Sequence, residues 1–326
     1  MILTVNLNAA LDHVIFVEDL NQRGMIRATK SIHCIGGKGA DTALALAQLG
    51  APHRLLSFNA GKNGETLKEL YKQHGIQSQL VEVSGETRIV TVIIETVQKK
   101  LTQISQSGYC ITEQDGKLFI DSLEQNLMQA NWCIAAGSLP QGASPDIHRI
   151  ICEQAHLADS KILIDVAGEP LLKALPAHPD IVKLNRREFQ TTFQGAFSSI
   201  ESLVNHARNL IQEYSLKMVM ITLGSEGILL INENDAFHAE SPLLEPINSA
   251  GAGDAASAAF VYQLFLGQPL ENALKMACAT SAAVVLSEGT AEFSLETMKS
   301  LLPKIQLSKI NQGAILSNTK SNIANL

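Results

Sequence analysis

Short apolar runs alternate with longer stretches of helical periodicity along most of this chain. The runs that we expect to form buried strands lie at residues 2–6, 132–136, 161–165, 181–183 and 218–222. The expected helices lie at residues 40–49, 64–73, 145–158, 200–214 and 255–266. Helices of this length supply the crossover connections that parallel strands need. The sequence therefore predicts an α/β fold, with a doubly wound parallel sheet and helices on both of its faces.

Two stretches of the chain, at about residues 13–34 and 86–107, interrupt this alternation. Neither shows a helical pattern, and residues 87–96 within the second stretch are rich in β-branched side chains, which favour strands. We expect a small second sheet that is inserted twice into the main domain, with surface hairpins of no role as the alternative. Residues 317–326 are polar and are expected to be loosely held. The expected division is a main α/β domain of residues 1–12, 36–85 and 108–303, a β-sheet lid of residues 13–35 and 86–107, and a tail of residues 304–326.

Charge and cysteine content limit the partners and the compartment of the protein. Asp and Glu outnumber Lys and Arg by 32 to 25, and the net charge of −7 offers no basic field to nucleic acid or to an anionic membrane. The first ten residues lack the pattern of a signal peptide, and no apolar run is long enough to span a membrane. The five cysteines form no C-x-x-C pair. We therefore expect a cytoplasmic protein with free thiols, which binds any anionic ligand at a local site.

Three glycine-rich turns carry the candidate chemistry. The first turn is Gly36-Gly37-Lys38-Gly39, directly before the helix expected at residues 40–49. Glycines at a helix N-terminus let backbone N–H groups approach an anion, and Lys38 adds a positive charge. The turn is not a Walker A loop, because Lys38 is followed by glycine instead of Ser or Thr. A tight turn with a solvated lysine explains this pattern equally well.

The other two turns lie in the C-terminal half of the chain. Residues 222–227 (TLGSEG) follow an expected strand, and an ordinary β-turn is the alternative interpretation. Residues 248–254 (NSAGAGD) lead into the helix expected at residues 255–266. Asp254 is either the N-cap of that helix or a catalytic carboxylate, and for an isolated Asp at a helix start the cap is favoured.

The third turn also allows a different class of enzyme. The spacing Gly251-x-Gly253-x-x-Ala256, with Glu271 about twenty residues further on, satisfies the loose dinucleotide-binding fingerprint of a dehydrogenase. That fingerprint belongs after the first strand of its unit, and Asp254 beside the glycines would repel a pyrophosphate. A dehydrogenase is therefore the weaker alternative.

In sequence order, these turns resemble the signatures of one enzyme family. Residues 36–50 (GGKGADTALALAQLG) and 248–260 (NSAGAGDAASAAF) resemble the two signatures of the PfkB or ribokinase-like carbohydrate kinases. Four shorter segments of the family pattern stand between them: residues 137–140 (GSLP), residues 165–168 (DVAG), residues 183–185 (KLN) with Glu188, and residues 222–227. The resemblance extends from Thr4 to about Thr290. Residues 4–12 (TVNLNAALD), with Thr87-Arg88 and GSLP, are similar to the branch of 1-phosphofructokinases and tagatose-6-phosphate kinases.

The resemblance implies a ribokinase-like fold and an ATP-dependent kinase. Such an enzyme transfers the γ-phosphate to a hydroxyl of a ketohexose phosphate, either fructose 1-phosphate or tagatose 6-phosphate. By the same resemblance, Asp254 is the general base that takes the proton from this hydroxyl. The backbone amides of Gly251, Ala252 and Gly253 form an anion hole for the transferring phosphoryl group.

The resemblance also implies cofactors and their binding residues. Asn185 and Glu188 stand in the family's N-x-x-E arrangement, which organises Mg²⁺ and its waters on the phosphates of ATP. Thr222, Gly224 and Gly227 line the nucleotide site. A monovalent cation is a further cofactor that the family resemblance implies.

On the acceptor side, the resemblance assigns residues from the N-terminal third of the matched region. Those expected to hold sugar hydroxyls or to lie beside them are Asp12, Gly36, Gly37, Gly39 and Asp41. Lys38 and Arg88 are expected to supply positive charge for the phosphate of the substrate, with Arg88 reaching from the lid as it covers the site. A closed lid excludes water and suppresses hydrolysis of ATP.

The chain departs from the usual pattern of this family at four positions. Asp41 stands in place of Asn, Ala167 in place of Ser, Leu184 in place of Pro and Ala259 in place of Gly. Asp41 bears on substrate identity, because an ionised carboxylate can only accept hydrogen bonds. We favour the interpretation that Asp41 accepts one from a sugar hydroxyl, with an Asp that is merely tolerated in the pocket as the alternative.

Two other functions and one alternative for the assembly remain open. The chain could phosphorylate an unphosphorylated sugar or a nucleoside, or it could be a catalytically weakened sensor of a sugar phosphate. The intact Asp254, Asn185 and Glu188 favour activity, whereas Asp41 and Ala167 leave the sensor open. The expected partners are a sugar phosphate, ATP and a second copy bound through the lid, although the lid sheet could equally be covered by its own chain.

Overall fold

A ten-stranded sheet forms the centre of the computed structural model, which describes residues 1–21, 24–197 and 199–310. The strand order is β14-β13-β12-β11-β10-β9-β8-β1-β4-β5. The strands are β1 (Ile2–Asn6), β4 (His53–Asn59), β5 (Ser78–Glu82), β8 (Trp132–Ala136), β9 (Lys161–Asp165), β10 (Ile181–Asn185), β11 (Met218–Thr222), β12 (Ile228–Asn232), β13 (Ala236–Glu240) and β14 (Gln306–Lys309). From β5 to β11 neighbouring strands pair in parallel, and from β11 to β14 they pair antiparallel.

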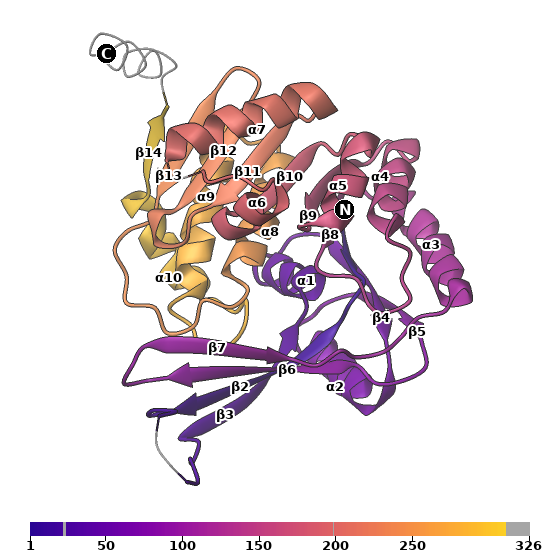
Figure 1. Cartoon of the computed structure of the whole chain (residues 1–326), viewed down its shortest axis with the longest axis vertical. Coiled ribbons are helices and arrows are strands. Elements are labelled where there is room, and N and C mark those ends of the chain that lie inside the picture. Colours follow the sequence, from indigo (N-terminus) through magenta and orange to yellow (C-terminus); the bar gives the residue numbers. More distant parts are fainter. Residues whose placement is uncertain (22–23, 198, 311–326) are drawn as a thin grey trace.

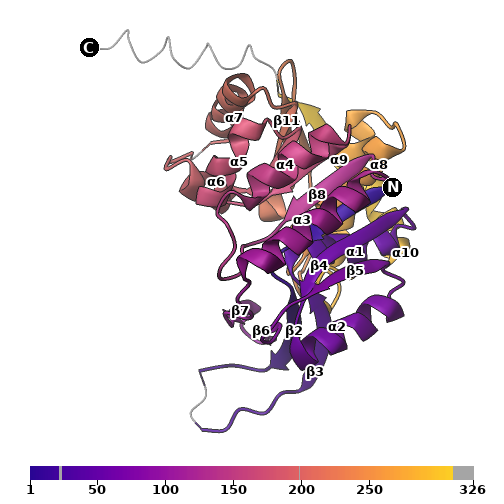
Figure 2. The same ribbon diagram turned by 90° about the vertical axis from the view of Figure 1, so that its right-hand side faces the viewer.

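Helices cover both faces of this sheet, as the alternation of strands and helices predicts (Figures 1 and 2). They are α1 (Lys38–Gln48), α2 (Gly61–Gln73), α3 (Glu113–Leu127), α4 (Ile147–Leu157), α5 (Glu169–Ala174), α6 (Arg186–Thr192), α7 (Ile200–Tyr214), α8 (Ala252–Phe265), α9 (Leu270–Val284) and α10 (Leu295–Leu301). Side chains of β1 alternate between two hydrophobic clusters, with Leu3 and Val5 in one and Ile2 in the other. The first cluster packs against α3, α4 and α7, and the second against α8, α9 and α10. The predicted doubly wound α/β class is therefore confirmed.

A separate four-stranded sheet lies below α1 in Figure 1. Its strands are β3 (Lys30–Gly36), β2 (Ala10–Val17), β6 (Arg88–Glu95) and β7 (Lys100–Ser105), in that order. The two expected insertions therefore meet in one sheet, through the parallel pairing of β2 with β6. We call it the second sheet.

The second sheet begins earlier than expected. The expected main domain includes residues 1–12, but β2 already starts at Ala10, soon after β1 ends at Asn6. Asp12 therefore belongs to the second sheet, where it pairs with Cys34 and Val90 across the strands. This correction matters for the site, because it moves an expected acceptor-binding residue to the sheet that faces the main domain.

The C-terminal part of the chain also differs from the expectation. The predicted tail of residues 304–326 contains β14, which pairs antiparallel with β13 and forms one edge of the main sheet. Its polar composition suits an edge strand, where alternate side chains face solvent. The expected loose segment, residues 317–326, lies outside the described residues. Among the described helices, none is both long and apolar enough to cross a membrane.

Candidate active site

A cavity of about 830 Å³ lies between the second sheet and the carboxyl ends of β10 and β11. Open α/β sheets bind their ligands at this edge, outside the carboxyl ends of the strands. Most of the site residues expected from the sequence line this one cavity: Asp12, Gly37, Lys38, Asp41, Arg88, Asn185, Glu188, Thr222, Gly224, Gly227, Gly251, Ala252, Gly253 and Asp254. The fold therefore brings the first turn, at residues 36–39, together with two turns that lie about 200 residues further along the sequence.

Gly36 and Gly39, which were expected to hold sugar hydroxyls, do not line the cavity. A side chain on Gly36 would overlap the carboxylate of Asp12, and one on Gly39 would overlap the backbone of Val5 and Asn6. These two glycines allow close packing of the chain around α1. The structure thus gives Gly36 and Gly39 a packing role, and their expected contact with substrate stays a prediction.

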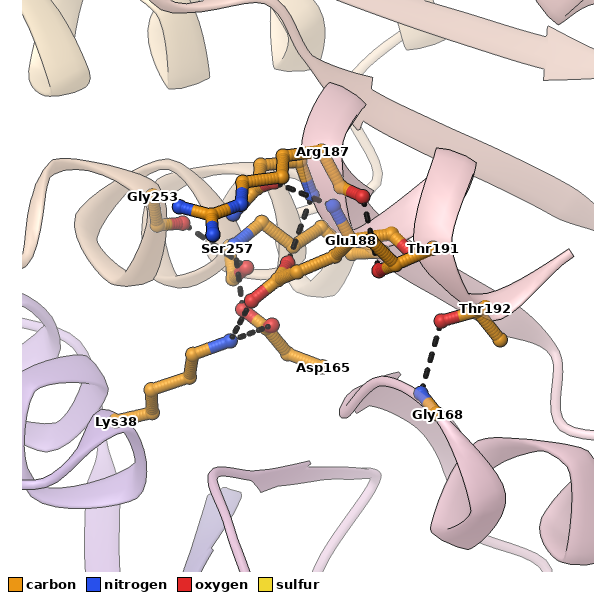
Figure 3. A network of polar contacts seen from close by, with 11 residues as sticks. Lys38, Asp165, Gly168, Arg187, Glu188, Thr191, Thr192, Gly253 and Ser257 are labelled. Atoms are coloured by element: carbon orange, nitrogen blue, oxygen red, sulfur yellow. Dashed lines mark hydrogen bonds and ion pairs between the residues drawn. The ribbon is translucent and has the colours of Figure 1, made fainter. Parts of the chain in front are cut away.

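Lys38, the first residue of α1, is held between two carboxylates (Figure 3). Its Nζ lies 3.0 Å from Oδ1 of Asp165 and 2.9 Å from Oε1 of Glu188. Burial alone would lower the pKa of Lys38, but the charges of Asp165, Asp254 and Glu188 outweigh burial and raise this pKa above its usual value. Lys38 therefore keeps its positive charge. Its ammonium group is already paired with two carboxylates, so it is not free to pair with a substrate phosphate.

Asp165 also binds a second lysine. Oδ2 of Asp165 lies 2.6 Å from Nζ of Lys183, and both side chains are buried. Burial raises the pKa of Asp165, but Lys183 and Lys38 outweigh it and leave this pKa below its usual value. Lys183 points toward the start of α8, because a Cβ on Gly253 would lie 2.8 Å from its Nζ. The cavity wall thus contains a buried cation beside the expected anion hole.

Asp254 is not the N-cap of its helix. Gly251 is the N-cap of α8, and Asp254 is the third residue of the helix and makes no capping hydrogen bond. The side chain is buried, and its Oδ1 has no hydrogen-bond partner among the described residues. Burial, helped by the charge of Asp165, raises the pKa of Asp254 to about 7. A carboxylate with a pKa near neutrality is suited to act as a general base.

Arg88 and Asp12 face the cavity from the second sheet. Arg88 donates from Nη1 to Oγ of Ser105 at 2.8 Å and from Nη2 to the carbonyl oxygen of Asn8 at 3.1 Å. Asp12 accepts a hydrogen bond from Oγ1 of Thr290 at 2.9 Å. Burial raises the pKa of Asp12 to about 7, although Thr290 and Arg88 act in the opposite direction. Arg88 is hydrogen-bonded only to uncharged groups and can pair with an anion.

A smaller cavity of about 350 Å³ adjoins this side of the site. Arg88, Lys38 and Glu188 border both cavities, and Ser138 of the GSLP segment borders only the smaller one. Oγ of Ser138 lies 3.0 Å from Nδ2 of Asn8, which donates to it. The smaller cavity therefore offers hydroxyl and guanidinium donors close to the acceptor side.

Asp41 lies in the first turn of α1 and is only 5% exposed. Its Oδ1 has no hydrogen-bond partner. Burial, together with the charges of Asp254 and Asp12, raises the pKa of Asp41 well above its usual value. This environment disfavours the ionised hydrogen-bond acceptor that was expected for Asp41.

Asn185 and Glu188 form a capping box at the start of α6. Oδ1 of Asn185 accepts from the backbone N–H of Glu188 at 2.8 Å, and Oε2 of Glu188 accepts from that of Asn185 at 2.9 Å. Each side chain thereby satisfies a backbone donor that the helix leaves free. Because Glu188 also binds Lys38, it is not merely a charge on a helix face.

The TLGSEG segment follows β11 and contains a 3₁₀ turn at Gly224–Glu226. Arg186 of α6 holds this turn through its Nη1, which lies 2.8 Å from Oε1 of Glu226. Thr222, Gly224 and Gly227 line the cavity on this side. An ion pair therefore holds this turn at the edge of the cavity, where the nucleotide site was expected.

Three site residues had no assigned role in the sequence analysis: Asp165, Lys183 and Thr290. The signal for Lys183 is a lysine within an otherwise apolar run, since an unpaired charge is rarely buried in a strand. The signal for Asp165 is a carboxylate at the carboxyl end of β9. Thr290 has no comparable local signal, because its partner Asp12 is 278 residues away in the sequence.

Comparison with known proteins identifies the family. A family model described as "pfkB family carbohydrate kinase" matches residues 6–298, which is most of the chain. The chain belongs to this family. It is 30% identical over 312 residues to 1-phosphofructokinase of Bacillus subtilis (strain 168), which covers 95% of this chain and all of the relative. It is 31% identical over 316 residues to 1-phosphofructokinase of Haemophilus influenzae, with 95% and 98% coverage.

Solved structures show the same fold as this pfkB family member. A possible 1-phosphofructokinase from Thermotoga maritima superimposes with a TM-score of 0.88 and 24% identity, over 95% of this chain and all of that one. Phosphofructokinase-2 from Escherichia coli, solved in complex with substrates and products, gives a TM-score of 0.85 and 21% identity, with 93% and 99% coverage. The ribokinase-like fold that the sequence resemblance implies is therefore confirmed.

Membership of the pfkB family confirms that the chain is a phosphotransferase with an alcohol group as acceptor. The dehydrogenase alternative is wrong, and the local structure shows why. The glycines at Gly251 and Gly253 follow the antiparallel strand β13 after a segment of ten residues or more, so they do not form a turn from a parallel strand into a helix. The dinucleotide fingerprint requires that turn, which brings the pyrophosphate to the helix N-terminus.

Proposed function

We propose that this chain transfers the γ-phosphate of ATP to a free hydroxyl of fructose 1-phosphate. The bacterial relatives named 1-phosphofructokinase support this substrate over tagatose 6-phosphate. The observation that carries the proposal is Asp254, a buried carboxyl with an unpartnered oxygen and a pKa near 7. It lies on the wall of a cavity that also contains a guanidinium, from Arg88.

Asp254 takes the proton from the attacking hydroxyl, and the start of α8 stabilises the transferring phosphoryl group. The backbone amides of Gly251, Ala252 and Gly253 are at the N-terminus of this fourteen-residue helix, where the partial positive charge of the helix dipole lies. The ammonium of Lys183 is also close to Gly253, although its charge is paired with Asp165. Donors fixed in place before the reaction stabilise developing charge without reorganisation.

The acceptor lies between the second sheet and α8 in this proposal. Arg88 binds the phosphate that the sugar already carries, because its partners Ser105 and Asn8 leave its charge unpaired. Asp12, Gly37 and Asp41 border the sugar. Lys38 contributes through the field of its charge, since two carboxylates already occupy its Nζ.

Asn185 and Glu188 fit a magnesium ion that is held mainly by phosphates and water. Magnesium prefers oxygen ligands and keeps several waters, and Glu188 offers a partly exposed carboxylate at the cavity wall. Among the described residues, no group of three or more His, Cys, Asp and Glu could hold a metal by itself. A magnesium ion bound there neutralises charge on the phosphates of ATP. Thr222, Gly224 and Gly227 border the rest of the nucleotide.

We also propose that the protein forms a homodimer through the second sheet and that it is cytoplasmic. Phosphofructokinase-2 of Escherichia coli has been solved in a tetrameric form. In this chain Ile104 of β7 is 57% exposed and does not line the cavity, which suits contact with another surface. Sedimentation velocity of the wild type and of Ile104→Glu tests the dimer, which the charged residue should weaken.

The proposed cytoplasmic location agrees with the cysteines. All five are free thiols, as expected in the reducing cytosol.

A turnover screen tests the proposed function. Purified protein is incubated with ATP, Mg²⁺ and a panel of fructose 1-phosphate, tagatose 6-phosphate, fructose 6-phosphate, unphosphorylated hexoses and nucleosides. The panel is repeated with and without K⁺, because phosphofructokinase-2 of Escherichia coli has been solved with potassium. We expect the highest kcat/KM for fructose 1-phosphate. A preference for an unphosphorylated acceptor would contradict the proposal, and binding without turnover would identify a sensor.

A further inference from the structure

Three carboxyl groups from distant parts of the chain line the main cavity. Asp12 comes from β2, Asp41 from α1 and Asp254 from α8. All three are buried. Asp12 accepts a hydrogen bond from Thr290, whereas one oxygen of Asp41 and one of Asp254 have no partner. In their ionised forms, these three groups repel an anionic sugar phosphate in this cavity.

Asp41 is the carboxyl group with the weakest compensation. The cation on its own helix, Lys38, is paired with Asp165 and Glu188. Arg88 attracts Asp41 but is hydrogen-bonded to uncharged partners, without a direct pair to Asp41. The titratable and charged groups that face Asp41 from the surrounding elements are Asp254 of α8, Asp12 of β2, Arg88 of β6, Lys38 of α1, Cys34 of β3 and Tyr71 of α2.

Burial and the neighbouring negative charges both raise the pKa of Asp41. An ionised carboxylate without its own cation is expensive to bury, and a neutral carboxyl is much less so. Two further carboxyl groups beside the same cavity add like-charge repulsion whenever they ionise. The pKa of Asp41 is accordingly raised well above its usual value, by burial first and then by Asp254 and Asp12. Protons bound by such neighbours titrate as a coupled set rather than one by one.

We infer that Asp41 binds the acceptor as a neutral carboxylic acid, whose O–H donates a hydrogen bond to an oxygen of the sugar phosphate. This inference rests on the proposed function for the identity of the acceptor. The proton has two effects: it removes one negative charge from a pocket that takes an anion, and it turns Asp41 from an acceptor into a donor. Asp41 is then a specificity-determining residue, and acceptor binding depends on a proton held at this position.

The protonation state can be tested without catalysis. In protein labelled with ¹³C at the Asp carboxyl carbons, infrared difference spectra between wild type and Asp41→Asn should contain the carbonyl band of a protonated carboxyl at pH 7. The band should disappear at a lower pH in Asp12→Asn than in wild type, because loss of the neighbouring negative charge lowers the pKa of Asp41. Absence of a protonated carboxyl band at pH 7 in the wild type would overturn the inference, even if Asp41→Asn fails to fold.

Thermal stability gives a second readout. In the unfolded chain Asp41 ionises near its ordinary pKa of about 3.9, whereas in the folded chain it keeps its proton to a higher pH. The unfolded state then binds fewer protons, so this group lowers stability as the pH rises above about 4, until it also ionises in the folded protein. The Tm of Asp41→Asn minus that of wild type should therefore increase between pH 4 and pH 7. A difference that stays constant over this range would contradict a proton on Asp41.

Kinetics connect the proton to the acceptor. As the pH rises through the ionisation of Asp41, the KM of the wild type for fructose 1-phosphate should rise by about 10-fold or more, since a hydrogen bond to a charged group is lost. The KM for ATP should not follow this rise, and Asp41→Asn should lack the alkaline rise whatever its absolute rate. An identical alkaline rise in wild type and Asp41→Asn would overturn the inference. If no ketohexose phosphate is turned over but the infrared band is present, the proposed function fails and the protonation of Asp41 stands.

Discussion

At the scale of single residues, Asp254 offers the most direct test of the chemistry. Asp254→Asn keeps the shape of the side chain and removes the base, so kcat should fall by at least about 10²-fold while ATP still binds. The variant should be no less stable than wild type at pH 7, because it no longer buries a group that ionises. Steady-state kinetics, ATP calorimetry and Tm measure the three effects.

The pH dependence of the wild type follows from the same residue. Asp254 acts as a base only when ionised, and its pKa of about 7 places this ionisation near neutrality. The kcat should therefore rise as the pH increases through about 7 and then level off. Near-normal turnover in Asp254→Asn would show that Asp254 is not the base.

Arg88 tests the acceptor side. Arg88→Ala should raise the KM for the sugar phosphate by about 10- to 150-fold, which corresponds to the ~1.5–3 kcal/mol of a hydrogen bond to a charged group. The KM for ATP should change much less. Arg149→Ala is the matched control, because Arg149 lies on α4 and pairs with Glu153 and Asp146 of the same helix. Equal effects of Arg88→Ala on both substrates would indicate a folding role.

At the scale of elements, α8 begins after Gly251, which is constrained by its backbone conformation and by a close neighbour. Gly251 has φ 77°, and a Cβ there would overlap Ala291. Gly267, just beyond the other end of α8, has φ 71° but no atom within 4 Å of the position of its Cβ. Gly267→Ala should therefore cost only the left-handed conformation, about 1–2 kcal/mol.

The comparison of these two glycines separates backbone strain from packing. Gly251→Ala should lose more stability than Gly267→Ala, and it should also lose kcat, because the overlap shifts the amides that lead into α8. Chemical denaturation and kinetics on both variants measure this. Equal losses of stability, with kcat unchanged in Gly251→Ala, would show that the contact with Ala291 relaxes without cost.

The capping box of α6 links a helix start to the cation site. In Glu188→Gln the amide oxygen can still accept from the backbone of Asn185, so the free energy of unfolding should change by no more than about 1 kcal/mol. The loss of charge should raise the Mg²⁺ concentration needed for half-maximal rate. Thr112→Ala disrupts the capping box of α3, away from the cavity, and should cost about 1 kcal/mol without any effect on Mg²⁺. An unchanged Mg²⁺ requirement in Glu188→Gln would remove Glu188 from the metal site.

At the scale of the whole molecule, the last described strand closes one edge of the main sheet. Truncation after Ile305 removes β14 and exposes the edge of β13, which should cost about 2–4 kcal/mol through lost ladder hydrogen bonds and promote aggregation. Truncation after Ile310 keeps β14 and the hydrogen bond from Ile310 to Ala236, and serves as the control. Urea unfolding and light scattering distinguish the two proteins. Equal stability of both truncated proteins would show that β14 contributes little.

Five of the ten strands of the main sheet and five of the ten described helices were predicted from the sequence. The apolar runs at residues 2–6, 132–136, 161–165 and 218–222 match the bounds of β1, β8, β9 and β11, because each run is a buried strand with polar or turn residues beside it. The predicted helix starts were wrong where a glycine-rich turn leads into a helix. The expected starts at residues 40 and 255 are in fact at Lys38 and Ala252, since a helix can begin within a glycine-rich turn once its amides are satisfied.

The sequence by itself determined the α/β class, the family and the order of the turns, because periodicity and local spacing are properties of neighbouring residues. Only the tertiary structure decided how the charged groups are paired and protonated. Lys38 meets Asp165 across 127 positions of sequence, and Asp41 meets Asp254 across an even longer stretch. Desolvation and Coulomb energies depend on burial and on distances in space, so a carboxyl that looked like an ionised acceptor in the sequence is, in the folded protein, in surroundings that favour its proton.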